Sequence, residues 1–380
     1  MQVPFHKPYI AEEEIEQVVD SLKSGWVTMG PKTIEFENQF KNYIFGNSSI
    51  PQEKQFAIAV NSCTAALHLA LKAIDLKQGD EVILPTNTFV ATAEVVTYFK
   101  AIPVLCDIEE STHNMDVSKI EDLITEKTRV ILPVHFGGQP CDMNEIMEIA
   151  RNHHLYVIED AAHALPAKYR GKTIGTIGDI TCFSFYATKT LCTGEGGMIT
   201  TTNEEFAKRM KINRLHGINR DAWDRYTLKG DWYYEVVDNG HKYNTTDINS
   251  ALGLAQLKKI EWMWQRRLEI AKKYNDVFLK SRIKPVIVKN DRESAWHLYV
   301  VKVNNRDELI KKLKEDGIGT SVHFIPVHKH PYYKNAFGYD EKNFPVANSV
   351  FEKCVSLPIY PGMKSDEQDF VIERVLKYAR

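Results

Sequence analysis

Residues 155–164 read Leu155-Tyr-Val-Ile-Glu-Asp160-Ala-Ala-His163-Ala, an apolar run that ends in a carboxylate and is followed by small residues. A continuous apolar run of this length is typical of a strand that is covered on both faces of a sheet. Ligands of open α/β sheets bind beyond the carboxyl ends of such strands. This stretch therefore predicts an α/β fold with a ligand site at Asp160.

Similar apolar runs lie on both sides of this strand along the chain. The expected strands are Phe56–Val60, Glu81–Pro85, Pro103–Asp107, Arg129–Val134, Leu155–Asp160, Ile180–Phe185 and Gly197–Thr201. Helical patterns at about 63–74, 90–100, 117–124 and 143–153 fill most of the gaps. Repeated strand–helix units predict a doubly wound α/β domain whose mainly parallel, seven-stranded sheet is sandwiched by helices.

The pattern changes after residue 245, where long helices replace the alternation. The expected elements there are helices at Asp247–Ile260 and Glu261–Leu279, a strand at Trp296–Val303 and helices at Arg306–Asp316 and Ser365–Tyr378. This change predicts a large α/β domain over residues 1–255, which includes the N-terminal segment, and a smaller α/β domain over residues 256–380.

Composition narrows the class of protein. The 380 residues are 43% hydrophobic and 26% charged, as in an ordinary soluble globular protein, and the net charge of −2 gives no electrostatic reason to expect nucleic acid or an anionic membrane as partner. The start does not resemble a secretory signal, and no apolar run approaches the roughly 20 residues that span a bilayer. The six scattered cysteines contain no C-x-x-C pair. We therefore expect a cytoplasmic protein with reduced thiols and no zinc site.

Two further strand ends carry polar groups. After 56–60, the run Asn61-Ser-Cys-Thr64-Ala65 opens a helix, and a helix N-terminus with a hydroxyl suits a phosphate, although a plain N-cap is the simpler alternative. After 180–185, Ser184 precedes Lys189. Burial disfavours an ammonium group, and an uncharged lysine amine forms Schiff bases with carbonyl cofactors. A lysine that snorkels to solvent is the alternative.

Asp160 fits the same interpretation. A carboxylate that emerges from an apolar strand is costly unless it is paired, and a protonated pyridine nitrogen is a suitable partner. An aspartate that caps the next helix is the alternative. Thr64, Asp160, Ser184 and Lys189 together place a phosphate site, a carboxylate and an amine at three strand ends, which indicates a pyridoxal phosphate (PLP) site.

Further motifs are spread over the chain: Ser24-Gly-Trp-Val-Thr28-Met-Gly30-Pro31, Pro85-Thr-Asn-Thr-Phe89-Val-Ala-Thr92-Ala, Glu159-Asp-Ala-Ala-His163, Gly194-Glu-Gly-Gly197, Arg214-Leu-His-Gly217, Tyr243-Asn244 and Val322-His323-Phe324. In these motifs the chain resembles the fold-type I PLP enzymes and, among them, the DegT/DnrJ/StrS family of nucleotide-sugar aminotransferases. The likeness runs nearly from end to end.

The resemblance implies a role for each cofactor residue. Lys189 would form the Schiff base, Asp160 would pair with the pyridine nitrogen, His163 would lie near the phenolic oxygen, and Phe89 would stack on the ring. Thr64, Ala65 and Ser184 would bind the phosphate. Asn244 would reach the phosphate of the neighbouring subunit, which would make a homodimer obligatory for activity.

The resemblance also implies the reaction. L-Glutamate would leave as 2-oxoglutarate while the cofactor becomes pyridoxamine phosphate, and a nucleotide-linked keto sugar would then take the amino group. The expected substrate is a UDP-4-keto sugar aminated at C4 for a cell-surface glycan or lipopolysaccharide. The alternatives are C3 amination of a dTDP-3-keto-6-deoxyhexose and amination of GDP-4-keto-6-deoxymannose. Two alternative functions come from outside the aminotransferases. One is a sugar dehydratase, which resembles the family but carries histidine in place of the lysine. The other is a non-catalytic regulator.

Candidate substrate residues complete the prediction: Thr28, Arg220, Arg225, His323 and His328. The guanidinium groups of Arg220 and Arg225 match the geometry of a nucleotide diphosphate, although a solvated loop is the alternative. Thr28 enters by resemblance only. His323 and His328 would contact the sugar or transfer protons. No acidic or thiol companion accompanies these histidines, so we expect no metal site.

Overall fold

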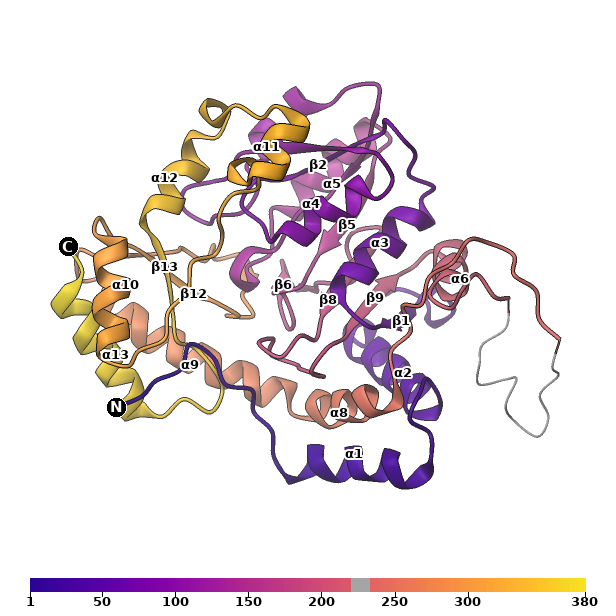
Figure 1. Cartoon of the computed structure of the whole chain (residues 1–380), viewed down its shortest axis with the longest axis horizontal. Coiled ribbons are helices and arrows are strands. Elements are labelled where there is room, and N and C mark those ends of the chain that lie inside the picture. The colour runs from indigo at the N-terminus through magenta and orange to yellow at the C-terminus, as the bar shows by residue number, and fades with distance from the viewer. Residues whose placement is uncertain (220–232) are drawn as a thin grey trace.

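The structure is a computed structural model of the chain, and it describes residues 1–219 and 233–380. Within these residues, seven strands form the central sheet in the order β1-β9-β8-β5-β4-β2-β3. Figure 1 labels β1, β9, β8, β5 and β2 of this sheet. The bounds of the seven strands are β1 (Phe56–Val60), β2 (Glu81–Pro85), β3 (Ile102–Cys106), β4 (Thr128–Ile131), β5 (Tyr156–Asp160), β8 (Ile180–Ser184) and β9 (Gly197–Thr201). β9 runs antiparallel to β1 and to β8, while the other strands pair in parallel. The expected mainly parallel sheet is confirmed.

Helices bury both faces of this sheet. In β1, Ile58 and Val60 belong to one core and Ala57 and Ala59 to another, because successive side chains of a strand point to opposite faces. The first core includes residues of α3 (Cys63–Ala73), α4 (Val90–Thr97) and α6 (Glu204–Asn213), and the second includes residues of α2 (Pro31–Phe45), α5 (Met143–Asn152) and α8 (Asp247–Lys258). Burial on both faces explains why the strands read as continuous apolar runs.

One expected helix has a different form. Residues 117–124 form two short 3-10 helices, η2 (Val117–Lys119) and η3 (Glu121–Leu123), instead of one α-helix. The Asp116 carboxylate accepts a hydrogen bond from the Ser118 N–H at 3.1 Å and so begins the first of them. This local bond competes with a regular helical start, which the apolar spacing alone does not reveal.

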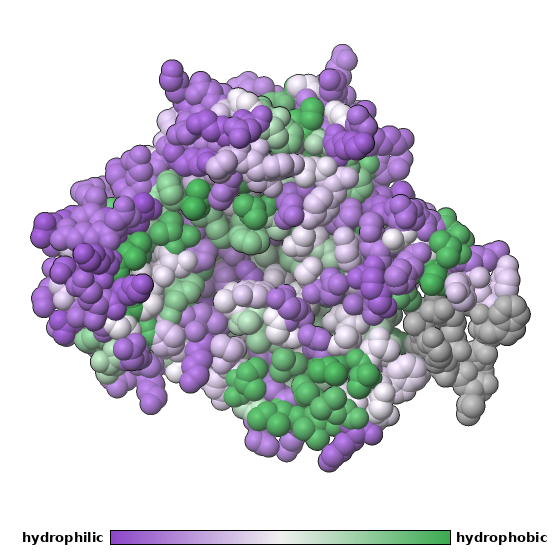
Figure 2. All heavy atoms as spheres, viewed as in Figure 1, coloured by the Kyte–Doolittle hydropathy of each residue, from purple (hydrophilic) through white to green (hydrophobic). Residues whose placement is uncertain are grey.

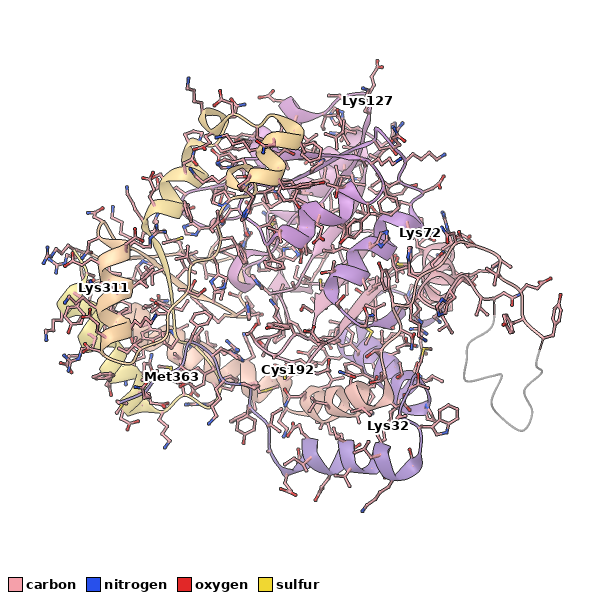
Figure 3. The ribbon with its side chains drawn as sticks, in the orientation of Figure 1. Lys32, Lys72, Lys127, Cys192, Lys311 and Met363 are labelled. Carbon is pink, nitrogen blue, oxygen red and sulfur yellow. The ribbon has the colours of Figure 1, made fainter. Side chains whose placement is uncertain are left out.

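The N-terminal helix α1 (Glu12–Ser24), which the sequence pattern did not predict, packs along α8. Glu14 is fully buried there, where its carboxylate accepts a hydrogen bond from Gln256 Nε2 at 2.9 Å and lies 2.9 Å from Lys259 Nζ. Lys32, labelled in Figure 3, reaches from α2 to Asp20 of α1 with 2.7 Å between Nζ and Oδ2. Polar contacts thus hold α1 beside the large sheet.

A second sheet follows the long helix α9 (Ile260–Phe278) and contains β10 (Lys284–Pro285), β12 (Tyr299–Lys302) and β13 (Cys354–Leu357). With α10 (Arg306–Glu315) and α13 (Ser365–Tyr378), it encloses a third core, which includes Tyr274 and Phe278. Val3 joins this core from the N-terminus and bridges to Ile318. We keep the division into residues 1–255 and 256–380 as a proposal, which this separate core supports.

The remaining elements connect these layers. They are η1 (Gln52–Lys54), η4 (Phe136–Gly138), η5 (Val327–Lys329), η6 (Glu341–Asn343), α11 (Pro331–Phe337), α12 (Pro345–Lys353), and a small sheet of β6 (Lys168–Tyr169), β7 (Lys172–Thr173) and β11 (Arg292–Glu293). Over the described ranges, none of the helices is both long enough and apolar enough to cross a bilayer.

Candidate active site

A cavity of about 620 Å³ lies at the carboxyl ends of the central strands. Seven residues singled out in the sequence line it: Thr64, Phe89, Asp160, His163, Ser184, Lys189 and His323. They come from the ends of β5 and β8, from the starts of α3 and α4, and from the segment before η5. The fold therefore brings the expected amine, carboxylate and hydroxyl groups into one space.

The N-terminus of α3 opens toward this cavity. Ser62 caps the helix, since its Oγ accepts a hydrogen bond from the Ala65 N–H at 3.1 Å, and Thr64 and Ser184 place hydroxyls on the wall beside it. A Cβ at Gly197 would lie 2.7 Å from the carbonyl carbon of Ser62, so glycine allows β9 to approach the helix start. Ala65 is buried and its side chain does not line the cavity. A helix N-terminus with two hydroxyls fits a phosphate.

Asp160 ends β5 and is buried. Its Oδ2 accepts a hydrogen bond from Thr92 Oγ1 at 2.8 Å and its Oδ1 accepts one from the Ala162 N–H at 3.1 Å. Burial raises the pKa of this carboxyl, while both hydrogen bonds and the charge of Lys189 act in the opposite direction. A buried carboxylate with an open side toward a cavity fits a cationic ring nitrogen.

Lys189 lies on the loop between β8 and β9. Main-chain bonds hold this loop, with the Lys189 N–H donating to the Tyr186 carbonyl at 2.9 Å and the Thr193 N–H donating to the Phe185 carbonyl at 2.8 Å. Asn249 of α8 donates a hydrogen bond to the Thr193 carbonyl at 2.7 Å. Cys192 of the same loop is labelled in Figure 3, where the loop lies next to α8. Desolvation, with a smaller effect of Arg267, lowers the pKa of Lys189 to about 8. Its amine is therefore available as a nucleophile.

His163 stands opposite a second buried histidine. Its ring centroid lies 4.3 Å from that of His297, and its Nδ1 accepts a hydrogen bond from the Gly137 N–H at 3.3 Å. Burial and the charge of Lys189 lower the pKa of His163 well below its usual value. The ring is therefore neutral, and because Nδ1 accepts, the proton lies on Nε2. His163 offers a neutral N–H donor.

Several residues that line the cavity were not among the predicted site residues, among them Phe5, His6 and His297. His6 Nε2 bonds the Ala187 carbonyl at 3.1 Å, and the Phe5 ring stacks on His323 with centroids 5.7 Å apart. Neither residue belongs to a motif, and both reach the cavity because the N-terminal segment crosses to it. Only for His297 was there a signal, a histidine in the apolar run 296–303.

Other predicted residues lie elsewhere. Asn244 does not line the cavity of its own chain, and its N–H donates to the Arg214 carbonyl at 3.1 Å. Thr28 is exposed and its carbonyl accepts from the Asp247 N–H at 2.9 Å. Arg220 and Arg225 fall outside the described residues.

The structure corrects the interpretation of His328. Its side chain is fully buried away from the cavity wall, where Nδ1 lies 2.7 Å from Thr86 Oγ1 and Nε2 lies 3.0 Å from Asn348 Oδ1. The ring also stacks on Phe344 with centroids 4.4 Å apart. Because both nitrogens and one ring face are occupied by the protein, His328 has a structural role instead of a contact with the sugar.

The donor set fits PLP as a whole. Lys189 supplies an amine for the aldehyde, Asp160 a carboxylate for the ring nitrogen, and the start of α3 a positive dipole for the phosphate, all on one cavity. In residues 1–219 and 233–380, no cluster of histidine, cysteine and acidic side chains suits a metal ion.

Comparison with known proteins agrees with this chemistry. Residues 8–376 match the DegT/DnrJ/EryC1/StrS aminotransferase family. The chain belongs to this family. It is 48% identical to the spore coat polysaccharide biosynthesis protein SpsC of Bacillus subtilis, with 98% of this chain and 96% of SpsC covered.

Solved structures of the family share the fold. The putative sugar aminotransferase Spr1654 from Streptococcus pneumoniae in its PMP form matches with a TM-score of 0.91 at 36% identity, covering 99% of this chain and 98% of Spr1654. Helicobacter pylori PseC, an aminotransferase involved in the biosynthesis of pseudoaminic acid, matches with a TM-score of 0.90 at 27% identity over 99% of both chains. Spr1654 is also known in a PLP form. The chain is thus a fold-type I, PLP-dependent sugar aminotransferase.

Proposed function

We propose that this aminotransferase moves the amino group of L-glutamate to C4 of a UDP-linked 4-keto sugar. The observation that carries the transfer itself is the meeting of Lys189 and Asp160 on one cavity. The sugar is inferred from the resemblance of residues 216–226, 243–249 and 317–324 in the sequence to enzymes that aminate C4 of UDP-linked sugars. The names of SpsC and PseC, which refer to a spore coat polysaccharide and to pseudoaminic acid, support a product for a cell-surface glycan or lipopolysaccharide.

The residues of the chain would divide the work. Bound PLP supplies an electron sink that stabilises negative charge at the substrate carbon. The Lys189 amine, once released, takes a proton from the α-carbon of glutamate and returns it at the cofactor, acting as general base and then as general acid. Asp160 holds the ring nitrogen, and the neutral His163 offers its Nε2–H to the phenolic oxygen. For the keto sugar the same groups act in reverse order.

The alternatives differ in which residue or sugar carries the activity. A C3 aminotransferase acting on a dTDP-3-keto-6-deoxyhexose and an enzyme acting on GDP-4-keto-6-deoxymannose would share the cofactor site. A dehydratase on this scaffold carries histidine at the lysine position, whereas this chain places Lys189 on the cavity. A non-catalytic regulator needs no nucleophilic amine, so the lowered pKa of Lys189 counts against it.

A substrate panel tests the proposal. The purified chain with PLP is given L-glutamate and UDP-, dTDP- and GDP-linked 3-keto and 4-keto sugars, and the products are identified by mass and NMR. We expect 2-oxoglutarate together with a 4-amino UDP sugar, and no product from the Lys189→Ala variant. Turnover of 3-keto sugars alone would sink the C4 assignment, while transfer by Lys189→Ala at the normal rate would sink the role of the lysine.

We also propose a homodimer that shares its active sites. The outer face of α1 exposes Ile15, Val19 and Leu22, at 49%, 39% and 53%, and Figure 2 shows an apolar patch in this region at the lower edge of the molecule. Contiguous apolar patches mark interfaces. Asn244 lies off the cavity of its own chain, which supports a contact with the phosphate of a second copy. Mixing inactive Lys189→Ala and Asn244→Ala chains should restore activity through hybrid dimers; failure to do so would contradict the shared site.

The cytoplasm remains our proposed compartment. All six cysteines are free thiols, and five of them are buried. Reduced cysteines suit a reducing compartment.

A further inference from the structure

The environment of Asp160 contains a second layer of residues with a direct bearing on the reaction. Its carboxylate receives two hydrogen bonds from the protein, one from the main chain at Ala162 and one from the Thr92 hydroxyl. The charge of Lys189 also acts on this carboxylate. Thr92 is therefore the one side chain, within residues 1–219 and 233–380, that hydrogen-bonds this carboxylate.

The direction of the hydrogen bonds follows from the number of protons. An ionised carboxylate only accepts, so the single hydroxyl proton of Thr92 is donated to Asp160. Thr88 Oγ1 lies 2.7 Å from Thr92 Oγ1 and must then be the donor of that bond. The result is an oriented chain from Thr88 to Thr92 to Asp160. Hydrogen bonds in such a chain polarise one another and strengthen the last one.

The backbone keeps this chain in place. Thr88 and Thr92 are 1% and 0% exposed, and both line the cavity. They stand four residues apart across the start of α4, where the Thr92 N–H donates to the Phe89 carbonyl at 3.2 Å. Residues four apart lie on the same side of a helical turn, and β-branched side chains have few rotamers. The hydroxyls therefore have little freedom to turn away from Asp160.

Burial makes this support necessary. It raises the pKa of Asp160, and the bonds from Ala162 and Thr92 act against that rise. Loss of the Thr92 hydroxyl would leave Oδ2 without its protein donor in a buried site, which favours the protonated acid. A protonated, freely rotating carboxyl is a poor partner for a pyridinium.

We propose that Thr92 is a positioning residue for amino transfer: its hydroxyl, oriented by Thr88, fixes the Asp160 carboxylate for pairing with the pyridine nitrogen of PLP. This inference rests on the pairing assigned to Asp160 in the proposed function. Phe89, which is expected to stack on the PLP ring, lies between the two threonines in sequence. The start of α4 would therefore supply both the side chain that stacks on the ring and the hydroxyl that orients Asp160 toward the ring nitrogen.

The test measures cofactor binding and not only turnover. PLP affinity and the pH dependence of the absorption of bound PLP are compared for the wild type, Thr92→Val, Thr92→Ser, Thr88→Val and Asp160→Asn. Valine keeps the shape of threonine and removes the hydroxyl, whereas serine keeps the hydroxyl. Loss of a hydrogen bond to a charged group weakens binding by a factor of about ten or more in the dissociation constant. We expect Thr92→Val to bind PLP about tenfold more weakly, Thr92→Ser within about twofold of the wild type, and Thr88→Val in between.

The absorption spectrum of bound PLP provides a second measurement, which depends on the charge of the pyridine ring. In Thr92→Val, the pH at which the absorption of bound PLP changes should move upward, because the ring loses positive charge. A PLP analogue with carbon in place of the pyridine nitrogen provides the matched control. It cannot pair with Asp160, so its affinity should be the same for Thr92→Val and for the wild type. An equal loss for PLP and the analogue would show a merely structural role and overturn the proposal.

The remaining outcomes separate this inference from the proposed function. If Asp160→Asn weakens PLP but Thr92→Val and Thr88→Val do not, the positioning role is wrong while the role of Asp160 stands. If Asp160→Asn binds PLP as well as the wild type does, the pairing assigned to Asp160 fails, and this inference fails with it. Should Thr92→Val not fold, Thr88→Val decides, since wild-type binding by that variant contradicts the chain of hydrogen bonds.

Discussion

The Lys189 side chain loses hydration as it enters the cavity wall, and that loss lowers its pKa from 10.5 to about 8. The same burial raises the pKa of Asp160, so the two groups are shifted toward their neutral forms and each opposes the shift of the other. The proposed roles require different charge states, because Lys189 would react as the uncharged amine and Asp160 would pair with a cation as the carboxylate. The hydrogen bonds from Thr92 and Ala162 stabilise the Asp160 anion, whereas desolvation remains the largest effect on the pKa of Lys189.

Cofactor capture should therefore follow the charge of Lys189. The uncharged amine is the reactive form, and its fraction grows as pH rises through about 8. At pH 7 about a tenth of the amine is uncharged, against less than a thousandth for an ordinary lysine. We expect the rate at which the cofactor-free chain captures PLP to rise with pH to a midpoint near 8, measured by stopped-flow absorbance. A midpoint near 10.5 would refute this, and Lys189→Arg, which has no nucleophilic amine, should show no capture.

At the scale of elements, Asp247 joins two helices that are far apart in the sequence. It stands in the first turn of α8, but its carboxylate accepts hydrogen bonds from the start of α2: Gly30 N–H at 2.7 Å, Lys32 N–H at 3.0 Å, Thr33 N–H at 3.0 Å and Thr33 Oγ1 at 2.7 Å. These N–H groups begin a helix and have no acceptor within it. A tertiary contact thus supplies the N-cap that Gly30, with no side chain, cannot provide.

Replacement of Asp247 by alanine should lower the free energy of unfolding by about 3 kcal/mol, because several buried donors lose a charged acceptor together. Chemical denaturation monitored by circular dichroism measures the change. The matched control is Asp276→Ala, which removes an exposed aspartate of α9 and should change stability by less than about 0.5 kcal/mol. Equal effects of the two substitutions would contradict the capping role.

At the scale of the whole molecule, the N-terminal segment ties the two sheets to the active site. The Val3 N–H donates to the Gly317 carbonyl at 2.9 Å, and the Gly319 N–H donates to the Val3 carbonyl at 2.8 Å. Phe5 and His6, which follow directly, line the cavity. The pairing of Val3 with residues 317–319 therefore positions two residues of the cavity wall.

Gly319→Ala should displace this segment, because a Cβ there would lie 2.5 Å from the Phe5 nitrogen. We expect faster hydrogen exchange at the amides of Val3 and of residue 319, and a kcat/KM about tenfold lower, since small displacements of cavity residues have large effects on rate. Gly362→Ala is the control, because the nearest atom to its Cβ would be Tyr9 Cδ2 at 3.8 Å. If the alanine at 319 leaves exchange and kcat/KM as they are in the control, the segment does not shape the site.

The sequence alone determined the seven strands, the mainly parallel sheet and the nature of the cofactor. Buried strands appear in the sequence as apolar runs, and the polar residues that follow each run lie at the end of the strand, where the ligand binds. Thr64, Asp160, Ser184 and Lys189 could be found in this way. Phe5 and His6 could not, because they have no local pattern and enter through a crossing of the chain. The buried setting of His328 and the orientation of Asp160 by Thr92 were also decided only by tertiary structure. Both depend on hydrogen bonds between segments 68 and 242 residues apart, which no local pattern encodes.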